Sequence, residues 1–297
     1  MKNVVANRRL DRRKVFFTRI SFIFLMILFV SALTVSFTKR KIETNSYLSN
    51  KVVNSTKKHK PSSVKKSVVV LKNQISNSGT RVEDVYKEDG KKTAYLTFDD
   101  GPSTTVTPRI LDTLKANGVH ATFFLMGQNI ERNSESKELV KRIYNEENAI
   151  GDHTYSHSLK KLYPHNLLDV SAFMSEVDET QNILKNILGP TFFTRIIRMP
   201  GGYMSRKYYK DPNLIEFDNI LKQRNMVNID WNAYDFDAEG RKRYAGELLD
   251  KVKNTVKGKN KVVILMHDTY GKEETAKALP DIIQYLKEQG YEFGTLK

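Results

Sequence analysis

The chain has 297 residues, which is enough for one large domain with a long appendage. Its formal net charge is +15, but residues 1–92 carry 21 Lys and Arg against 6 Asp and Glu, whereas residues 93–297 carry 28 against 28. A nucleic-acid-binding domain would carry its basic excess on the folded part, so we expect no nucleic-acid partner. The absence of cysteine excludes disulfides and thiolate metal sites, which leaves His and carboxylate side chains as ligands for any metal.

The N-terminal segment is typical of a membrane anchor. Six basic residues lie within residues 2–14, and residues 20–37 follow without a charge, which is long enough to cross a bilayer as a helix. The basic residues in front favour a cytoplasmic N-terminus and therefore a C-terminal domain on the outer side of the cell membrane. The alternative is a signal peptide cleaved near Ser31 and Ala32, after which the domain would be secreted.

The segment after the anchor is rich in Lys, Ser, Asn and Val and has no sustained helical or strand period, so it is interpreted as a spacer. The chain is therefore expected to have four parts. They are a basic cytoplasmic segment at 1–19, a transmembrane helix or signal anchor at 20–38, a basic flexible linker at 39–92 and a folded domain at 93–297.

Short apolar stretches alternate with amphipathic stretches after residue 92, which is the pattern of an α/β domain. Strands are predicted at 94–98, 121–126, 149–151, 196–199, 226–230 and 262–266. Helices are predicted near 107–117, 135–147, 167–188, 212–225, 243–256 and 273–289. No Gly-rich phosphate loop follows the first strand, which argues against a nucleotide-binding sheet. A barrel remains, and reactive groups in such barrels gather at the C-terminal ends of the strands.

Two adjacent carboxylates, Asp99 and Asp100, follow the first predicted strand and precede Gly101-Pro102. Successive strand residues point to opposite faces, so both can serve one site only if the backbone turns there. Two like charges this close repel each other unless a metal or an arginine neutralises them. The pair alone could be an ordinary polar turn, and the other strand ends decide between the two interpretations.

The ends of the later predicted strands also carry polar or aromatic side chains, and three of the six histidines of the chain are among them. These residues are His153 and His157 after the third strand, Arg198 after the fourth, Trp231 and Asn232 after the fifth, and His267 and Asp268 after the last.

A metal site is the chemistry that this set predicts. His153 and His157 are four residues apart, which would place both on one side of a helical turn, and Asp100 would complete a three-ligand site with open positions. Zinc is the default ion, although cobalt, nickel or another divalent ion would suit the same donors. Hydrolysis at such a site needs a base and an acid, which Asp99 and His267 can provide. Arg198 would pair with Asp99 and keep it ionised.

Several motifs together resemble those of one known family. TFDDGP at 97–102, HTYSH at 153–157, RMPGG at 198–202, DWN at 230–232 and LMHD at 265–268 are similar, in this order, to the motifs of polysaccharide deacetylases of carbohydrate esterase family 4, which contain the NodB homology domain. ATFFLMGQNI at 121–130 is similar to the second strand of the family. The resemblance covers residues 93–297 and implies a distorted (β/α) barrel, incomplete relative to a TIM barrel, with about seven strands.

The resemblance also implies a role for each residue of the site. Asp99 would be the general base, His267 the acid that protonates the departing amine, and Arg198 the residue that orients Asp99. The metal ligands would be Asp100, His153 and His157. The Gly201 N–H would stabilise the oxyanion together with the metal, and Trp231 and Leu265 would line the slot for the acetyl methyl group.

Two positions depart from the family pattern. The third motif commonly has an aromatic residue after its proline, whereas this chain has Gly201, which leaves one sugar-facing wall bare. Many members have an Asp three residues after the tryptophan of the fourth motif to tune the acid histidine, whereas this chain has Tyr234 there. Asp235 or Asp237 could substitute, and the sequence leaves the choice open.

The expected function is that of a membrane-anchored, metal-dependent deacetylase that removes N-acetyl groups from amino sugars of an extracytoplasmic polysaccharide, in particular peptidoglycan N-acetylglucosamine. One alternative is an esterase that removes O-acetyl groups from xylan-like or wall polymers. Another is a noncatalytic glycan-binding scaffold, which the complete set of reactive residues argues against.

Overall fold

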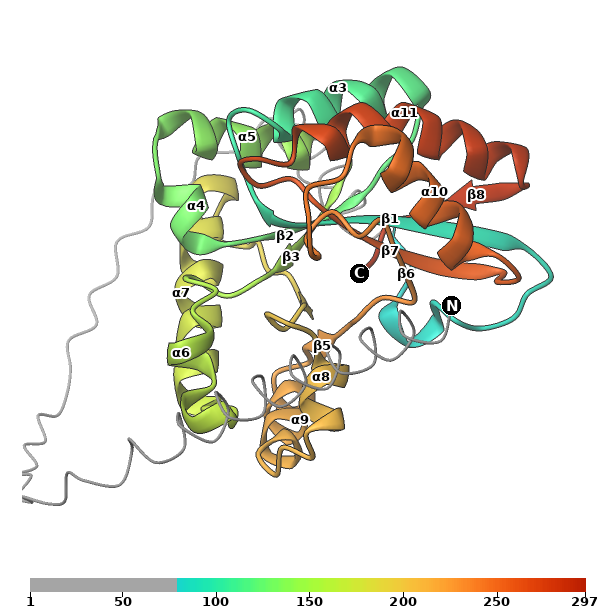
Figure 1. Cartoon of the computed structure of the whole chain (residues 1–297). Helices are drawn as coiled ribbons and strands as arrows, with labels where there is room; N and C mark the ends of the chain where they lie inside the picture. The colour runs from blue at the N-terminus through green and yellow to red at the C-terminus, as the bar shows by residue number, and fades with distance from the viewer. Residues whose placement is uncertain (1–78) are drawn as a thin grey trace, which may run out of the picture. The chain divides into compact units, whose positions relative to one another are not determined.

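The computed structural model describes residues 79–297 (Figure 1). The predicted anchor at 20–38 and most of the predicted linker lie outside the described residues. Within residues 79–297, no helix has both the length and the hydropathy that a bilayer crossing requires.

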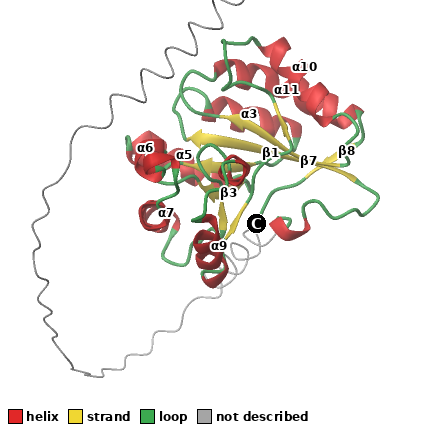
Figure 2. Ribbon diagram, turned by 60° about the horizontal axis from the view of Figure 1, so that its bottom comes forward, coloured by secondary structure: helices red, strands yellow, loops and turns green. Residues whose placement is uncertain are grey.

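One sheet of parallel strands forms the centre of the domain (Figure 2). The strand order is β5-β4-β3-β2-β1-β7-β6, and β8 pairs with β1 in addition. β5 and β6 form the two edges and do not pair with each other, so the barrel is open. The prediction of an incomplete parallel α/β barrel is therefore confirmed. The strands are β1 (Lys92–Gly101), β2 (Thr122–Leu125), β3 (Ala149–Asp152), β4 (Ile196–Ile197), β5 (Val227–Asn228), β6 (Ala233–Tyr234), β7 (Lys261–His267) and β8 (Tyr291–Phe293).

Six long helices connect the strands, and each overlaps a predicted one. They are α3 (Thr107–Asn117), α5 (Ser134–Asn145), α7 (Val170–Leu188), α9 (Leu214–Gln223), α10 (Ala245–Val256) and α11 (Glu273–Glu288). α3 shows how the sequence determines these elements: Pro108 lies in its first turn, and the helix ends at Gly118, which adopts a left-handed conformation.

The sequence patterns missed the shortest elements. These are β6 and β8, the short helices α4 (Gly127–Glu131), α6 (Leu159–Leu162) and α8 (Tyr203–Tyr208), and the 3-10 turns η1 (Val82–Asp84) and η2 (Pro164–Asn166). Elements of two to six residues are too short to show a hydrophobic period, so tertiary contacts determine them.

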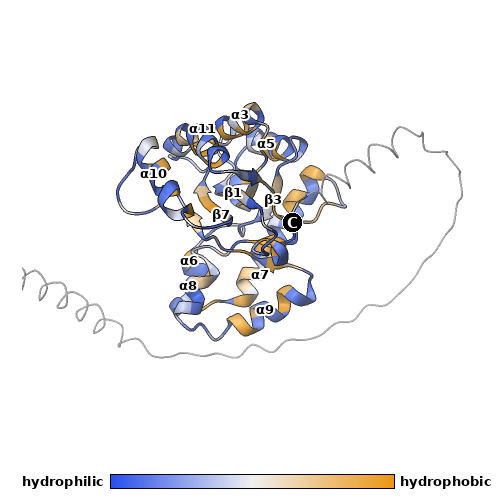
Figure 3. Cartoon of the chain, turned by 90° about the vertical axis from the view of Figure 1, so that its right-hand side faces the viewer, coloured by the Kyte–Doolittle hydropathy of each residue, from blue (hydrophilic) through white to orange (hydrophobic). Residues whose placement is uncertain are grey.

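The helices cover the sheet with their apolar faces, and their hydrophilic faces point outward (Figure 3). The main core joins β1, β2 and β7 to α3, α5, α10 and α11. A second core packs α7 against α9, with Phe173 and Phe217 in edge-to-face contact at 5.1 Å between ring centres. The two cores support opposite halves of the open barrel and hold the C-terminal ends of its strands in place.

Residues 79–92, which the sequence assigned to the flexible linker, belong to the folded domain. The Thr80 N–H donates to the carbonyl of Thr295 at 2.7 Å, and the Lys297 N–H donates to the carbonyl of Thr80 at 2.9 Å. Val85 is fully buried in a cluster with Ile229 and Leu296. The domain therefore begins before residue 93, because an apolar segment covers the inner face of an open barrel that would otherwise be exposed.

Candidate active site

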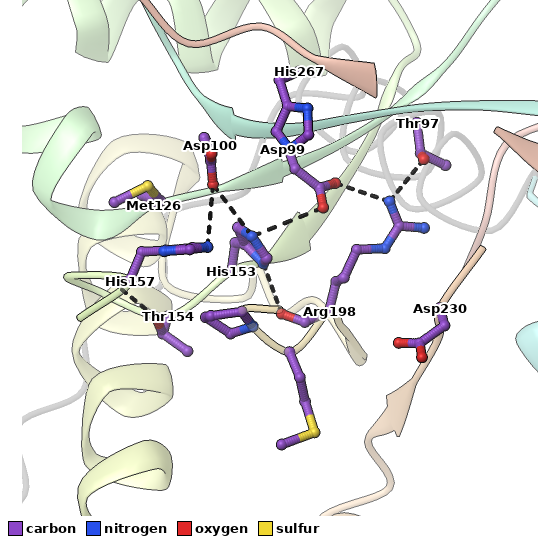
Figure 4. A network of polar contacts seen from close by, with 12 residues as sticks. Thr97, Asp99, Asp100, Met126, His153, Thr154, His157, Arg198, Asp230 and His267 are labelled. Atoms are coloured by element: carbon purple, nitrogen blue, oxygen red, sulfur yellow. Dashed lines mark hydrogen bonds and ion pairs between the residues drawn. The ribbon is translucent and has the colours of Figure 1, made fainter. Parts of the chain in front are cut away.

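A β-bulge brings the two adjacent carboxylates to one site. β1 continues through Gly101, and its register against β2 shifts between Asp99 and Gly101. Asp100 is the extra residue and has a φ of 67°. The bulge interrupts the alternation of side chains, so Asp99 and Asp100 both face the histidines at the end of β3 (Figure 4). The predicted backbone turn is therefore present at this pair.

Asp100, His153 and His157 form a three-residue cluster whose potential ligand atoms all lie within 4.8 Å of one another. Asp100 Oδ1 is 3.3 Å from His153 Nε2 and 3.6 Å from His157 Nε2. Two ligands that each lie about 2.1 Å from one tetrahedral zinc ion would be about 3.4 Å apart, so these separations fit a single ion. Asp100 Oδ1 is also buried without a hydrogen-bond partner among the described residues. Buried polar atoms normally have a partner, and a bound cation would provide one here.

Electrostatics within the cluster also favours a cation. Burial raises the pKa of Asp100, but the close contact with His153 Nε2 and the positive charges of His153 and His157 lower it by more, so its net pKa lies well below the usual value. The pKa of His157 is lowered by burial and by the neighbouring His153, so His157 is the more easily neutralised imidazole. A neutral imidazole and an ionised carboxylate are the protonation states that a metal requires.

The two histidines do not share a helical turn, so that part of the prediction is wrong. His153 follows β3 directly, and Thr154 and His157 have φ values of 65° and 54°, outside the helical range. Three hydrogen bonds hold this loop. The Thr154 N–H donates to Asp152 Oδ1 at 2.9 Å, and Glu176 accepts hydrogen bonds from the Ser156 N–H at 2.9 Å and the Ser156 hydroxyl at 2.7 Å. The loop thus achieves the proximity that a helix was expected to provide.

A backbone contact sets the tautomer of His153. His153 Nδ1 lies 2.7 Å from the Arg198 carbonyl oxygen, which can only accept, so Nδ1 carries the proton and Nε2 faces Asp100. His153 is buried, which lowers its pKa, but the charges of Asp99 and Asp100 raise it by more.

Arg198 is fully buried and holds Asp99 in position. Its Nη1 donates to Asp99 Oδ1 at 2.8 Å and to the Thr97 hydroxyl at 2.7 Å, and its Nε donates to the Ile229 carbonyl at 3.0 Å. The other oxygen of Asp99, Oδ2, lies 3.8 Å from His153 Nε2 and therefore faces the cluster of Asp100, His153 and His157. The predicted pairing of Arg198 with Asp99 is present in the structure.

His267 is paired with Asp237, which answers the question that the sequence left open between two aspartates. His267 Nδ1 lies 2.6 Å from Asp237 Oδ1, and Asp237 Oδ2 accepts from the His267 N–H at 3.1 Å and the Thr275 hydroxyl at 2.9 Å. Burial lowers the pKa of His267, but the hydrogen bond and charge of Asp237 outweigh it and raise the pKa to about 9. Asp235 is fully buried, and its Oδ1 accepts from the Asp237 N–H at 3.0 Å instead of contacting His267, so it is not the partner.

Among the described residues, none of the three predicted substrate-binding residues makes a hydrogen bond or ion pair with Asp100, His153 or His157. Gly201 is exposed, with a φ of 76°, and its N–H donates to no acceptor among the described residues. The Trp231 ring lies 5.7 Å from the Arg198 guanidinium, and a Cβ on Gly202 would come within 3.0 Å of it. Leu265 is partly exposed on β7, where it pairs with Thr97 of β1.

Asp268 is a supporting residue to which the sequence assigned no role. It is fully buried beneath the bulge, its N–H donates to the Asp99 carbonyl at 3.2 Å, and its Oδ2 accepts from the Thr107 hydroxyl at 2.5 Å. Burial raises the pKa of Asp268 to about 7. A Cβ on Gly101 would lie only 2.3 Å from both carboxylate oxygens of Asp268. The position of Asp268 directly after His267 was the only feature of the sequence that could have pointed to a role for it. The close approach of Asp268 to Gly101 is visible only in the folded structure.

Comparison with known proteins identifies the family of the chain. Residues 86–219 match the family model of polysaccharide deacetylase. The chain is 35% identical over 215 residues to a peptidoglycan-N-acetylglucosamine deacetylase of Bacillus cereus, which covers 69% of this chain and 67% of that protein. The structure is similar to that of a Streptococcus mutans CE4 esterase, with a TM-score of 0.68, 37% identity and coverage of 76% of this chain and 94% of the other.

A second solved structure has the same fold. It is the catalytic domain of a peptidoglycan N-acetylglucosamine deacetylase from Eubacterium rectale, with a TM-score of 0.62, 28% identity and coverage of 71% of this chain and 91% of the other. The identity to the Bacillus cereus relative, the family match and the shared fold agree on one assignment. The chain belongs to the polysaccharide deacetylases of carbohydrate esterase family 4 and is a hydrolase that acts on carbon–nitrogen bonds other than peptide bonds.

Proposed function

We propose that this protein removes the N-acetyl group from N-acetylglucosamine units of peptidoglycan with the help of a divalent metal ion, zinc by default. The observation that carries the proposal is the convergence of three groups at one end of the sheet: the Asp99–Arg198 pair, the cluster of Asp100, His153 and His157, and the His267–Asp237 pair. Base, ligand set and acid are the components that metal-assisted amide hydrolysis needs.

Each residue has a role that follows from its contacts. Arg198 occupies Asp99 Oδ1, so Oδ2 is the oxygen left to accept the proton of the attacking water. His267 engages Asp237 through Nδ1, which leaves Nε2 to donate a proton to the departing amine. The free N–H of Gly201 can donate to the oxyanion that develops on the acetyl oxygen. When bound, the metal ion supplies Lewis acidity that polarises the acetyl carbonyl and lowers the pKa of water.

The location of the enzyme is part of the proposal. The uncharged stretch 20–37, with six basic residues ahead of it, supports a single-pass anchor that leaves the domain on the outer side of the cell membrane. An enzyme in that position meets cell-wall glycan first, which supports peptidoglycan as the polymer. Secretion after cleavage is the alternative location.

Acetate release from purified peptidoglycan, measured with zinc supplied, tests the activity. Wild-type protein should release acetate, and the variants Asp99→Asn and His157→Ala should lose release by several orders of magnitude. Absence of acetate release from wild-type protein loaded with metal would overturn the proposal. Metal analysis of the purified protein separates an enzyme, which should hold about one ion per chain, from a noncatalytic scaffold, which has no need of one.

O-acetyl ester hydrolysis is the second candidate, because a solved relative with 37% identity is described as an esterase. The same base, acid and ligand set can serve an ester or an amide. Release from N-acetylated and O-acetylated glycans in competition distinguishes the two. Preferential release from the N-acetylated glycan supports the proposal, and preferential release from the O-acetylated glycan overturns it.

A further inference from the structure

The loop between β6 and α10, residues 235–244, brings Asp237 to His267. Its backbone has an unusual conformation directly before Asp237, where Phe236 has a φ of 63°. A bulky side chain rarely adopts this left-handed region, because it crowds the neighbouring backbone. Such a conformation persists only where the surrounding contacts hold it, and it is frequent at functional sites. The contacts that hold Phe236 therefore determine where Asp237 lies.

Arg243 holds this turn from the far end of the loop. Its Nη1 donates to the Phe236 carbonyl at 2.8 Å and also to the Glu239 carbonyl. Its guanidinium carbon lies 5.5 Å from the centre of the Phe236 ring. A guanidinium donates along fixed directions and is attracted to an aromatic face. One side chain therefore restrains both the backbone and the ring of Phe236.

The ring of Phe236 has two further neighbours. It stacks on Tyr234, with 4.1 Å between ring centres and 30° between ring planes. The Lys251 ammonium of α10 lies 5.1 Å from the centre of the same ring, which is a favourable position for a cation. Tyr234 is itself joined to α10, because the Thr255 hydroxyl accepts from its N–H at 3.2 Å and donates to its carbonyl at 3.1 Å. The ring is thus held against a fixed part of the domain.

Asp237 is fixed on the other side of the turn. Lys272 Nζ donates to the Asp237 carbonyl at 2.7 Å, and the Asp237 N–H donates to Asp235 Oδ1 at 3.0 Å. The Thr275 hydroxyl donates to Asp237 Oδ2 at 2.9 Å, and Oδ1 is the oxygen that contacts His267 Nδ1. Two consecutive carbonyls, of Phe236 and Asp237, therefore each accept from a cationic side chain.

We infer that Arg243 is a positioning residue of the active site, which holds the Phe236 turn in the left-handed conformation that directs Asp237 at His267. The inference rests on the proposed function, which gives His267 its task as the acid. Among the described residues, Arg243 has no hydrogen bond or ion pair with His267 or with the carboxylate of Asp237. Its effect on the acid must therefore pass through the backbone of the turn.

The sign of a pKa change distinguishes this role from a simple effect of charge. The charged groups that face His267 are Asp99 and Asp100 of β1, Asp235 and Asp237 of the loop, the adjacent Asp268, and Lys272, which is bound to the Asp237 carbonyl. Loss of the Arg243 cation would by charge alone raise the pKa of His267, because the imidazolium would be repelled less. Loss of positioning would lower this pKa, because Asp237 would no longer be held against the imidazolium.

NMR titration of His267 measures this change without turnover. The full-length protein in detergent, with isotope-labelled histidine, would be compared with Arg243→Met at the same zinc loading, and the loss of one signal in His267→Gln would assign His267. The pKa of His267 should fall by about 0.5–1 unit in Arg243→Met. Zinc affinity should stay within about 2-fold of wild type, since Arg243 contacts no member of the metal cluster. An unchanged or raised pKa of His267 would overturn the inference.

Two single variants serve as controls. Arg241→Met is the matched control, because Arg241 lies in the same loop but pairs with Glu247, so His267 should titrate as in wild type. Arg243→Lys keeps an ammonium that can donate to the Phe236 carbonyl and should return the pKa of His267 to within about 0.3 unit of wild type. The same fall in Arg243→Lys as in Arg243→Met would overturn the role of this hydrogen bond.

Two double variants test the mechanism. Asp237→Asn/Arg243→Met should titrate within about 0.2 unit of Asp237→Asn alone, because Arg243 acts through that carboxylate. A further fall as large as that in the single variant would overturn the inference. Asn adopts the left-handed conformation more readily than Phe, so Phe236→Asn/Arg243→Met should fold even if Arg243→Met does not. In that background, loss of Arg243 should shift the pKa of His267 by less than half as much, and an undiminished shift would contradict the role of the turn.

Turnover separates this inference from the proposed function. The alkaline limb of the kcat/KM profile for acetate release should move to lower pH in Arg243→Met and stay in place in Arg241→Met. If wild-type protein releases no acetate but Arg243→Met still lowers the pKa of His267, the proposed function fails and the positioning role stands. If acetate release is normal and His267 titrates alike in wild type and Arg243→Met, the positioning role fails alone.

Discussion

His267 Nδ1 lies 2.6 Å from Asp237 Oδ1, and this contact keeps the predicted acid charged at neutral pH. The pKa of Asp237 is lowered because the hydrogen bond and charge of His267 outweigh the effect of burial. In the same way, burial lowers the pKa of His267, but the hydrogen bond and charge of Asp237 outweigh it and raise the pKa to about 9. An acid must be protonated to act, so activity should fall on the alkaline side as the pH rises through the pKa of His267.

Asp237→Asn should therefore move the alkaline limb of the kcat/KM profile to lower pH, by at least one unit. Removal of the carboxylate removes the interaction that favours the imidazolium, so the pKa of His267 falls and the acid is lost earlier. Asp235→Asn is the matched control, because burial already raises the pKa of Asp235 and favours its neutral form. A profile of Asp237→Asn that coincides with wild type would contradict this assignment.

Arg198→Met should cost about 3–5 kcal/mol in the free energy of unfolding and abolish measurable turnover. Both Arg198 and Asp99 are buried, so the variant leaves an uncompensated carboxylate in the protein interior. Urea denaturation monitored by circular dichroism gives the loss. Arg195→Met serves as control, because Arg195 pairs with the exposed Glu83 and should cost about 1 kcal/mol or less.

The double variant Asp99→Asn/Arg198→Met shows how much of the stability loss comes from the unpaired carboxylate of Asp99. It should recover part of the lost stability, because no unpaired carboxylate remains, but none of the activity. Stability losses that simply add would show that the pair does not interact.

The sequence predicted the fold class and the main site residues because both depend on local, readable features. Hydrophobic patterns located the long helices, and polar residues after apolar strands marked one end of the sheet. Asp100, His153 and His157 could be grouped before any coordinates, since parallel strands bring their C-terminal ends together.

Other features depend on contacts between distant segments and had no local signal. The loop of His157 is held by Glu176, which lies 20 residues away from Ser156. The choice of Asp237 over Asp235 depends on the backbone between them, where Phe236 has a φ of 63°. Residues 79–92 resemble a linker in composition, and it is the burial of Val85 and the backbone hydrogen bonds of Thr80 to the C-terminal residues that show that they fold with the domain.

Glu176→Ala should weaken metal binding about 10- to 100-fold although Glu176 does not belong to the metal cluster. Its side chain is fully buried, accepts two hydrogen bonds from Ser156 and pairs with Lys161 at 2.8 Å, so its removal loosens the loop that carries His157. Zinc titration by calorimetry measures the change. Lys161→Ala removes the ion pair but leaves both Ser156 contacts, so it should bind zinc nearly as wild type does. Equal zinc affinities in Glu176→Ala and wild type would mean that the loop needs no such support.

Metal removal should lower the melting temperature as well as the activity. An ion present at about 100 times its dissociation constant stabilises the native state by about 2.7 kcal/mol, which corresponds to a shift of about 5–10 °C for a domain of this size. Dialysis against EDTA followed by zinc should reverse both losses. His153→Ala is the control, because two remaining ligands should give no zinc-dependent shift. The same shift in His153→Ala as in wild type would place the ion elsewhere.

Gly101→Ala should disrupt the site through steric overlap with Asp268. The new Cβ would lie 2.3 Å from both carboxylate oxygens of Asp268, closer than atoms can approach, and Gly101 directly follows the ligand Asp100. We expect a loss of about 1–3 kcal/mol in stability together with weaker zinc binding, because the bulge must shift to relieve the overlap. Gly246→Ala is the matched control in α10, where a Cβ meets nothing within 4 Å, so it should be neutral or stabilising by about 0.4–1 kcal/mol. Combination with Asp268→Ala removes the overlapping oxygens and should recover part of the zinc affinity. If Gly101→Ala binds zinc as well as Gly246→Ala does, the conclusion that the packing of Gly101 against Asp268 maintains the bulge is wrong.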